Sequence, residues 1–223
     1  MLFRSLNQII IQSLRREGRP PHFDLTIKAC AAVGRALMAC HAEGIIHRDL
    51  KPDNIIIENK TERPVLIDFG LVKQVGPSAE PSLTQSGVIK GTPHYMAPEA
   101  ISAPETVDAR SDLYALGAVG YYLLTGKLLF PGKTPMEVCW HHVQSSPVPP
   151  SERLGAEVPR PLETLILECL AKAPSKRPQT AGDLQARLHH CSGVGPWDGT
   201  RWWEDRKSTR LNSSHSSVSR MPS

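Results

Sequence analysis

Residues 45–57, which read IIHRDLKPDNIII, set the narrowest limits on the fold of this chain. Two isoleucine-rich runs, of the kind that favour β-strands, flank a loop that carries Asp49, Lys51 and Asn54. After a turn, a third short apolar run leads to Asp68-Phe69-Gly70. We therefore expect a small β-structure that brings two carboxylates, an amine and an amide close together.

These residue types match the needs of phosphoryl transfer. A carboxylate must orient the attacking hydroxyl, a cation must meet the transferring phosphoryl oxygens, and further oxygen ligands must hold Mg²⁺. The alternative is that Asp49, Asn54 and Asp68 are turn residues that cap backbone groups, which is the usual role of Asp and Asn in loops. Each residue taken singly fits that alternative better, whereas the combination favours phosphoryl transfer.

Three motifs, by their order and spacing, resemble those of protein kinases. His47-Arg48-Asp49, with Asn54 five residues past the Asp, resembles the catalytic loop. Asp68-Phe69-Gly70 resembles the metal-binding motif, and Ala97-Pro98-Glu99 resembles the end of the activation segment. The two motif Asp residues lie nineteen positions apart, and the Glu follows thirty-one positions after the second. The resemblance covers about residues 5–190.

The resemblance implies ATP and Mg²⁺ as cofactors and a protein substrate that accepts the phosphate on Ser or Thr. Lys51 two residues after Asp49, together with Gly91-Thr92, is similar to Ser/Thr kinases rather than Tyr kinases. The implied site residues are Asp49 for the substrate hydroxyl, Lys51 for the γ-phosphoryl group, Asn54 and Asp68 for Mg²⁺, Ile56 for the adenine ring, and Thr92 for substrate positioning.

Two further positions resemble the support residues of the family. Asp112 opens an apolar helix and is expected to hydrogen-bond the catalytic-loop backbone, and Arg177 is expected to form a buried pair with Glu99. The pairs His141-His142 and His189-His190 fall on helical faces without metal-ligand spacing. We expect all four of these histidines to be exposed or half-buried.

The resemblance also suggests how the kinase is regulated. Residues 71–96 are rich in Gly, Pro, Ser and Thr, and a long stretch without period is usually functional. Arg48 precedes Asp49, and a buried guanidinium there needs an anionic partner. Thr84 and Ser86 are similar to the autophosphorylation pair of bacterial Ser/Thr kinases, and a phosphate on either would provide that partner.

The periodicity predicts a mainly helical chain. Breakers at Gly18-Arg19-Pro20-Pro21 separate a first helix from a second, for which Asp24 is the expected N-cap and Gly44 the stop. Strands are expected at 44–47, 55–57 and 65–67, and helices at 5–17, 24–42, 97–102, 111–125, 134–144, 160–171 and 180–190.

Composition limits the classes of function that remain. The longest apolar run, residues 113–124, falls short of the roughly 20 residues of a membrane span, so we expect a buried helix and no membrane segment in this chain. The net charge is +4, and residues 201–223, with five basic and two acidic residues, supply +3 of it. Residues 1–200 therefore carry a net charge of only +1, which gives no reason to expect nucleic-acid binding. Five scattered cysteines, including Cys30 and Cys169 in apolar helical surroundings, indicate a reducing, cytoplasmic location.

We expect residues 1–192 to form a partial protein kinase domain. The fold class is α+β: a kinase-like C-lobe, mainly α-helical, with short β-hairpin strands at the catalytic loop. The N-lobe is expected to be absent, because no Gly-x-Gly-x-x-Gly, strand lysine or helix glutamate of the family precedes His47. Residues 193–223 are expected to be a disordered tail, and 205–223 look like translated sequencing-adapter sequence, with a genuine disordered tail as the alternative.

Two functions remain open on the sequence alone. The first is a kinase that transfers the γ-phosphoryl group of ATP to protein Ser/Thr, with this chain as an inactive fragment of it. The intact set of Asp49, Lys51, Asn54 and Asp68 favours that interpretation. The second is a non-catalytic, kinase-like interaction module, which the missing phosphate-binding motifs favour.

Overall fold

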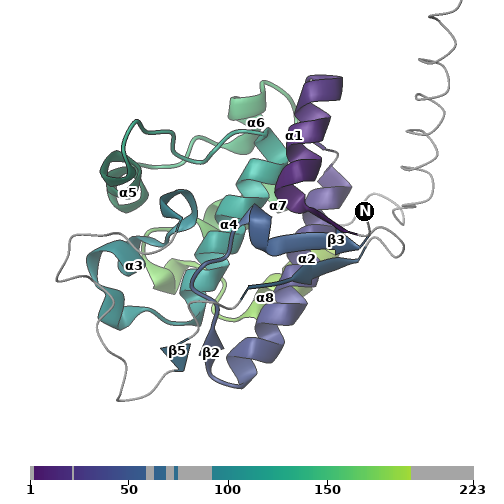
Figure 1. Ribbon diagram of the computed structural model, residues 1–223. Coiled ribbons are helices and arrows are strands. Elements are labelled where there is room, and N and C mark those ends of the chain that lie inside the picture. Colours follow the sequence, from purple (N-terminus) through teal and green to yellow (C-terminus); the bar gives the residue numbers. More distant parts are fainter. Residues whose placement is uncertain (1–2, 22, 59–62, 69–72, 75–91, 192–223) are drawn as a thin grey trace, which may run out of the picture. The chain divides into compact units, whose positions relative to one another are not determined.

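The computed structural model describes residues 3–21, 23–58, 63–68, 73–74 and 92–191 (Figure 1). The expected tail at 193–223 lies outside the described residues. The α-helices are α1 Leu6–Glu17, α2 Phe23–Ala42, α3 Pro98–Ser102, α4 Ala109–Thr125, α5 Pro135–Gln144, α6 Pro150–Leu154, α7 Arg160–Cys169 and α8 Ala181–Cys191. The strands are β1 Phe3–Ser5, β2 Ile45–Ile46, β3 Ile55–Glu58, β4 Pro64–Leu66 and β5 Lys73–Gln74, and the short 3₁₀ helices are η1 Pro52–Asn54, η2 Pro93–Tyr95, η3 Pro104–Thr106 and η4 Pro174–Lys176.

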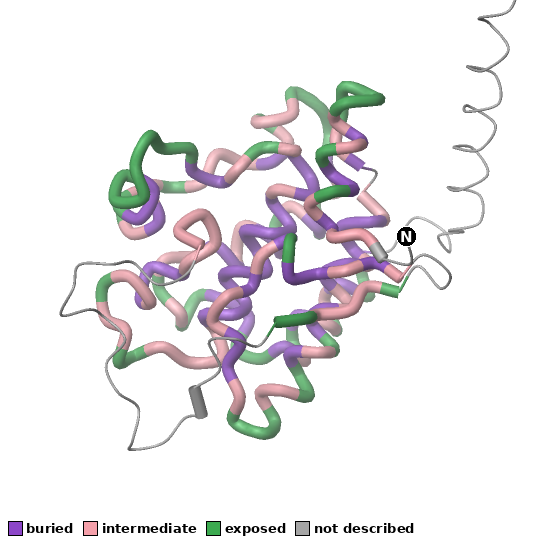
Figure 2. The backbone as a smooth tube through the Cα atoms, viewed as in Figure 1, coloured by how far each residue is buried: buried purple, intermediate pink, exposed green. Residues whose placement is uncertain are grey.

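Helix α4 is the centre of the core, and α2 and α7 pack against it (Figures 1 and 2). It begins at the N-cap Asp108, whose carboxylate accepts from the Arg110 backbone amide at 2.8 Å. Two of its glycines allow α7 to approach closely: a Cβ on Gly117 would lie 2.7 Å from Cys169, and one on Gly120 would lie 2.5 Å from Ile166. The expectation of a buried helix is confirmed, and no helix among the described residues is long and apolar enough to cross a membrane.

Two small antiparallel sheets lie beside the helices. In the first, β3 is the central strand between β1 and β4, with Ile56 opposite Val65. Ile55 and Ile57 are buried, while Ile56 on the other face is half-buried, as strand alternation requires. In the second sheet β2 pairs with β5. These two sheets fix both ends of the loop at residues 47–54.

The helical prediction is confirmed except for details. Helix α2 begins at Phe23, so the expectation of Asp24 as N-cap was wrong; Asp24 lies in the first turn, where a carboxylate favours the helix dipole. The stop is confirmed, because Gly44 follows the helix with φ of 70°. Strands β1 and β5 and helix α6 were not predicted, because each is five residues or shorter and shows no period.

Candidate active site

The loop at residues 47–54 gathers three polar side chains on one carboxylate. The Lys51 ammonium Nζ lies 2.5 Å from Asp49 Oδ2, and both side chains are largely shielded from solvent. Asn54 Nδ2 donates to the Asp49 backbone carbonyl at 2.9 Å and lies 3.4 Å from Oδ2. Thr92, 43 residues further along the chain, contacts the other oxygen, Oδ1, at 3.4 Å. Three of the residues that the sequence singled out, Lys51, Asn54 and Thr92, therefore meet at Asp49.

Asp68 is held near this loop by backbone contacts of its neighbour. The Ile67 amide donates to the Asn54 carbonyl at 2.8 Å, and His47 Nε2 lies 3.4 Å from the Ile67 carbonyl oxygen. Asp68 itself is exposed and directly follows these contacts. The carboxylate of Asp68 and the amide of Asn54 thus come from two segments that are hydrogen-bonded to each other.

Two residues of the site adopt the left-handed backbone region. Arg48 has φ of 65° and Asp68 has φ of 60°, and among the described residues they are the only residues other than glycine with positive φ. A side chain other than glycine in this region is uncommon and costs on the order of 1–3 kcal/mol where the surrounding structure enforces it. The strained positions therefore lie beside Asp49 and at the expected metal ligand.

Asp112 at the start of α4 holds the strained loop. Its carboxylate accepts from the backbone amides of His47 and Arg48, each at 2.9 Å, which confirms the expectation for this residue. His41 from α2 lies 2.9 Å from the same carboxylate. His41 was not predicted as a site residue, because its partner Asp112 lies 71 residues further along the chain.

Arg48 leaves an unsatisfied group in the site. Its Nε is buried and has no hydrogen-bond partner among the described residues. A buried guanidinium nitrogen without an acceptor costs free energy, so an anionic acceptor at this nitrogen would stabilise the site. The expected phosphate acceptors, Thr84 and Ser86, lie outside the described residues.

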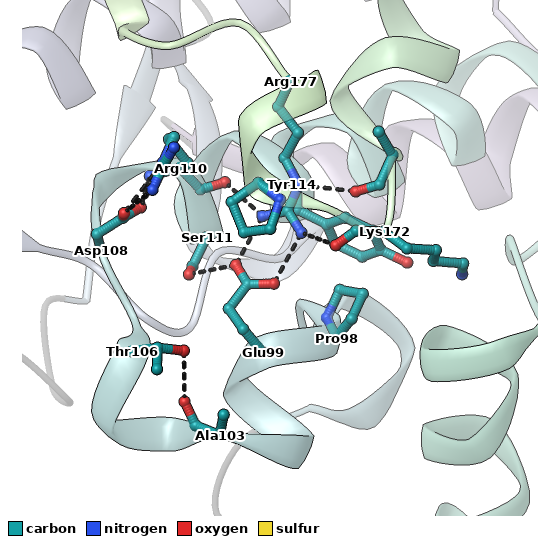
Figure 3. Close-up of polar contacts among 12 residues, drawn as sticks. Pro98, Glu99, Ala103, Thr106, Asp108, Arg110, Ser111, Tyr114, Lys172 and Arg177 are labelled. Atoms are coloured by element: carbon teal, nitrogen blue, oxygen red, sulfur yellow. Dashed lines mark hydrogen bonds and ion pairs between the residues drawn. The ribbon is translucent and has the colours of Figure 1, made fainter.

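A buried ion pair joins α3 to the segment after α7 (Figure 3). Arg177 donates to the two carboxylate oxygens of Glu99 at 2.6 and 2.7 Å, which confirms the predicted pair. Ser111 donates to the same carboxylate at 2.7 Å. Burial alone would raise the pKa of Glu99, but the hydrogen bonds from Arg177 and Ser111 lower it below its usual value.

One expectation for the histidines was wrong. His189 and His190 are exposed and His141 is half-buried, as expected, but the His142 side chain is fully buried on α5. Burial there depends on Tyr114 and Phe130, whose rings pack against it. Helical position alone does not reveal such partners, because they come from other elements.

The residues present fit a magnesium site. Since Asn54 uses Nδ2 for its hydrogen bonds, its Oδ1 is available as a ligand, and the exposed Asp68 carboxylate supplies further oxygens. Within the described part of the chain, no group of three or more His, Cys, Asp or Glu side chains is arranged to hold a metal alone. Two protein ligands leave coordination positions open, and in nucleotide sites Mg²⁺ fills such positions with phosphate oxygens and water.

Comparisons with known proteins agree with this geometry. The family described as the protein kinase domain matches residues 5–190. The chain is 43% identical over 162 residues to the serine/threonine-protein kinase PknB of Mycolicibacterium smegmatis, covering 73% of this chain and 25% of that protein. It is 39% identical over 191 residues to PknB of Mycobacterium tuberculosis, which covers 84% of this chain and 29% of that protein. It is 37% identical over 186 residues to serine/threonine-protein kinase pkn3 of Myxococcus xanthus, which covers 81% of this chain and 34% of that protein. The chain thus spans between a quarter and about a third of these relatives.

Proposed function

This chain belongs to the protein kinase family, and we propose that it supplies the catalytic loop, the Mg²⁺ ligands and the substrate-binding segment of a protein Ser/Thr kinase. The reaction is transfer of the γ-phosphoryl group from ATP to a Ser or Thr hydroxyl of a protein. The meeting of Lys51, Asn54 and Thr92 at Asp49 is the observation that carries this proposal. Similarity to PknB and pkn3, which are named serine/threonine-protein kinases, supports the choice of acceptor.

The two oxygens of Asp49 have different neighbours, and this suggests different roles. Oδ2 accepts a hydrogen bond from the Lys51 ammonium and a weaker contact from the Asn54 amide, so these two side chains hold it in place. Within the part of the chain that the structure describes, Oδ1 has only the long contact to the Thr92 hydroxyl, and it is available to accept a hydrogen bond from a substrate hydroxyl. In transfer, the hydroxyl oxygen bonds to the γ-phosphorus, the bond from that phosphorus to the bridging oxygen of ADP breaks, and Asp49 takes the hydroxyl proton.

Lys51 and the metal ligands act on the phosphates. The Asp49 carboxylate and the γ-phosphoryl oxygens are both anionic acceptors for the Lys51 ammonium. Lys51 Nζ can therefore move from Asp49 towards the γ-phosphoryl oxygens and neutralise part of their charge. Asn54 and Asp68 would hold Mg²⁺, which when bound neutralises charge on the phosphate oxygens. Ile56, half-buried on β3 beside this loop, would pack against the adenine ring.

We further propose that residues 1–192 act as the C-lobe part of the catalytic domain. Before His47 this sequence contains no Gly-x-Gly-x-x-Gly and no Val-Ala-Ile-Lys strand motif, the two motifs that bind the ATP phosphates from the other side in protein kinases. Positioning and electrostatics supply nearly all of the rate in phosphoryl transfer, so this polypeptide by itself should have negligible activity. Five cysteines without a disulfide fit a cytoplasmic location.

The test compares this chain with the same chain preceded by a kinase N-lobe. ATP-dependent labelling of a generic basic protein should occur in the extended chain and should be lost in Asp49→Asn. Asp183→Asn, the same chemical change at the start of α8, serves as the matched control and should keep the labelling. An extended chain that binds ATP without labelling any protein would support the non-catalytic interaction module, to which the missing motifs also point.

A further inference from the structure

His41, in the last turn of α2, binds the carboxylate that holds the loop at residues 47–54. Its Nε2 lies 2.9 Å from Asp112 Oδ2, and its side chain is 11% exposed, against 1% for Asp112. Because an ionised carboxylate only accepts hydrogen bonds, this contact places a hydrogen on Nε2. Within the described residues, His41 is the only side chain that hydrogen-bonds Asp112. The proposed mechanism gives this histidine no role.

One oxygen of this carboxylate binds both ends of a short segment. Asp112 Oδ2 accepts from the His47 backbone amide at 2.9 Å as well as from His41 Nε2. Between these two residues the chain turns at Gly44, whose amide donates to the His41 carbonyl at 3.1 Å, and then forms β2. Residues 41–47 are thus closed into a ring through a single oxygen, and β2 within this ring contacts both α2 and α4.

The other oxygen of the carboxylate depends on the same orientation. Asp112 Oδ1 accepts from the Arg48 amide at 2.9 Å, and Arg48 is the residue with the strained φ of 65°. One carboxylate serves both amides only while each oxygen lies near the direction of its N–H group. The bond from His41 to Oδ2 favours that orientation and restricts rotation of the carboxylate. A side chain of α2 therefore acts on the backbone directly before Asp49.

A simpler role for His41 would be confined to its own helix. A histidine in the last turn can bind the final carbonyls of the helix and is favourable against the helix dipole. His190 shows that role: it is exposed in the last turn of α8, and its Nδ1 lies 2.7 Å from the Ala186 carbonyl oxygen of the same helix. His41 instead contacts a residue 71 positions away on α4. The contact of His41 therefore joins two helices, and His190 provides the matched control.

We propose that His41 is a positioning residue for Asp49 and acts through the Asp112 carboxylate. By fixing the orientation of that carboxylate, His41 keeps the backbone of residues 47 and 48 in the geometry that aims Asp49. The consequence for catalysis, a slower phosphoryl-transfer step, rests on the proposed function. The consequence for the backbone of residues 47 and 48 rests on the hydrogen bonds alone.

Amide hydrogen exchange on this 223-residue chain tests the structural part. The His47 and Arg48 amides both donate to Asp112 and report on the loop directly. In His41→Phe, which keeps an aromatic ring but no donor, we expect both amides to exchange about five- to tenfold faster, the factor that loss of one buried hydrogen bond gives. His41→Gln, which keeps an N–H donor towards Asp112, should restore most of the protection.

Three further variants make the result decisive. His190→Phe, the same change in the last turn of α8, should leave the exchange of the His47 and Arg48 amides unchanged. In Asp112→Asn, which has already lost the carboxylate, the addition of His41→Phe should raise their exchange by less than about twofold, because both changes act on one contact. His41→Ala also removes the donor, and it serves if His41→Phe does not fold.

Three results of these exchange measurements would overturn the proposal. The first is wild-type exchange of both amides in the variant that removes the donor. The second is an equal rise over the buried amides of α7, which would mean that the His41 ring only supports packing. The third is a full five- to tenfold effect of His41→Phe in the Asp112→Asn background, which would mean that His41 does not act through Asp112.

A kinetic measurement addresses the role in catalysis separately. In the chain extended by an N-lobe, His41→Phe should lower kcat for an acceptor peptide about five- to tenfold with KM for ATP unchanged, because Asp49 acts on the hydroxyl in the transition state. His41→Gln should recover most of that kcat. If the wild-type extended chain labels no peptide, the proposed function fails while the exchange result still decides the structural role. If it labels peptide and His41→Phe keeps the wild-type kcat, the positioning role in catalysis is wrong.

Discussion

Replacement of Glu99 by Ala should destabilise the protein more than the loss of any surface ion pair. Arg177 has a side chain that is 0% exposed, and it makes five hydrogen bonds, one for each of its N–H donors. Three go to the backbone carbonyls of Ala171, Arg110 and Lys172, and two go to Glu99. Without Glu99 two of the donors lose their acceptor, and the buried positive charge loses the carboxylate that pairs with it.

The expected cost follows from that geometry. Breaking a buried pair by removing one partner costs about 3–5 kcal/mol, which is a large part of the ~5–15 kcal/mol that stabilises a typical domain. For a domain of this size that is a fall in Tm of roughly 10 °C. The matched control is Glu168→Ala, because Glu168 pairs with Arg187 at side-chain exposures of 39% and 40% and should contribute under about 1 kcal/mol.

Urea denaturation at neutral pH, followed by circular dichroism, measures both variants against the wild type. The pH dependence gives a second check with Glu99→Gln. Because the folded-state pKa of Glu99 is lowered from its ordinary value of 4.5, the stability that the pair contributes is present above that pH and lost as the pH falls below it. The difference in the free energy of unfolding between wild type and Glu99→Gln should therefore become smaller below about pH 4.5. If Glu99→Ala and Glu168→Ala lost the same amount of unfolding free energy at neutral pH, the reasoning would be refuted.

Three other predictions concern separate parts of the chain. Because the pKa of His142 is lowered to about 3, the wild type should lose stability relative to His142→Phe as the pH falls below 6.5. The loss should reach up to about 1.4 kcal/mol per pH unit, and denaturation at pH 7.5, 6 and 5 measures it. Gly126→Ala should cost about 1–2 kcal/mol or more in thermal unfolding, because φ is 67° and a Cβ would lie 2.7 Å from Leu14; Gly155→Ala, with φ of 65° and open space, should cost less. In the kinase completed by an N-lobe, mass spectrometry should find phosphate on Thr84 or Ser86, and Ala at both should lower the activity about tenfold or more; activity at the parent rate would contradict an activating role.

The sequence predicted the long elements well because their signal is local. Residues 113–124 are apolar in almost every position, so a helix there must be buried on all sides, and α4 is. The two strands that flank residues 47–54 were predicted from β-branched runs for the same reason. Strand β5 shows the limit: its two residues form a strand only because β2 pairs with them.

The candidate site could be predicted as a set of residues but not as a geometry. The order of motifs pointed to Asp49, Lys51, Asn54 and Thr92, yet which oxygen of Asp49 each residue contacts depends on the fold. His142 was misjudged because its partners, Tyr114 and Lys172, are 28 and 30 residues away in the sequence. A pattern of three- and four-residue spacings carries no information at that range.

The two hydrogen bonds by which Asp112 holds the loop at residues 47–54 have a consequence for biosynthesis. The two hydrogen bonds join residues 64 and 65 positions apart, so the loop leaves the ribosome long before the carboxylate that fixes its strained backbone. At a translation rate of about 5–20 residues per second, this delay lasts on the order of 3–13 seconds. During that interval a nascent chain has the Asp49 side chain but not the backbone geometry that aims it. Synthesis itself thus postpones the assembly of the site until α4 has been made, and an aborted product that stops before residue 112 would have no means to form it.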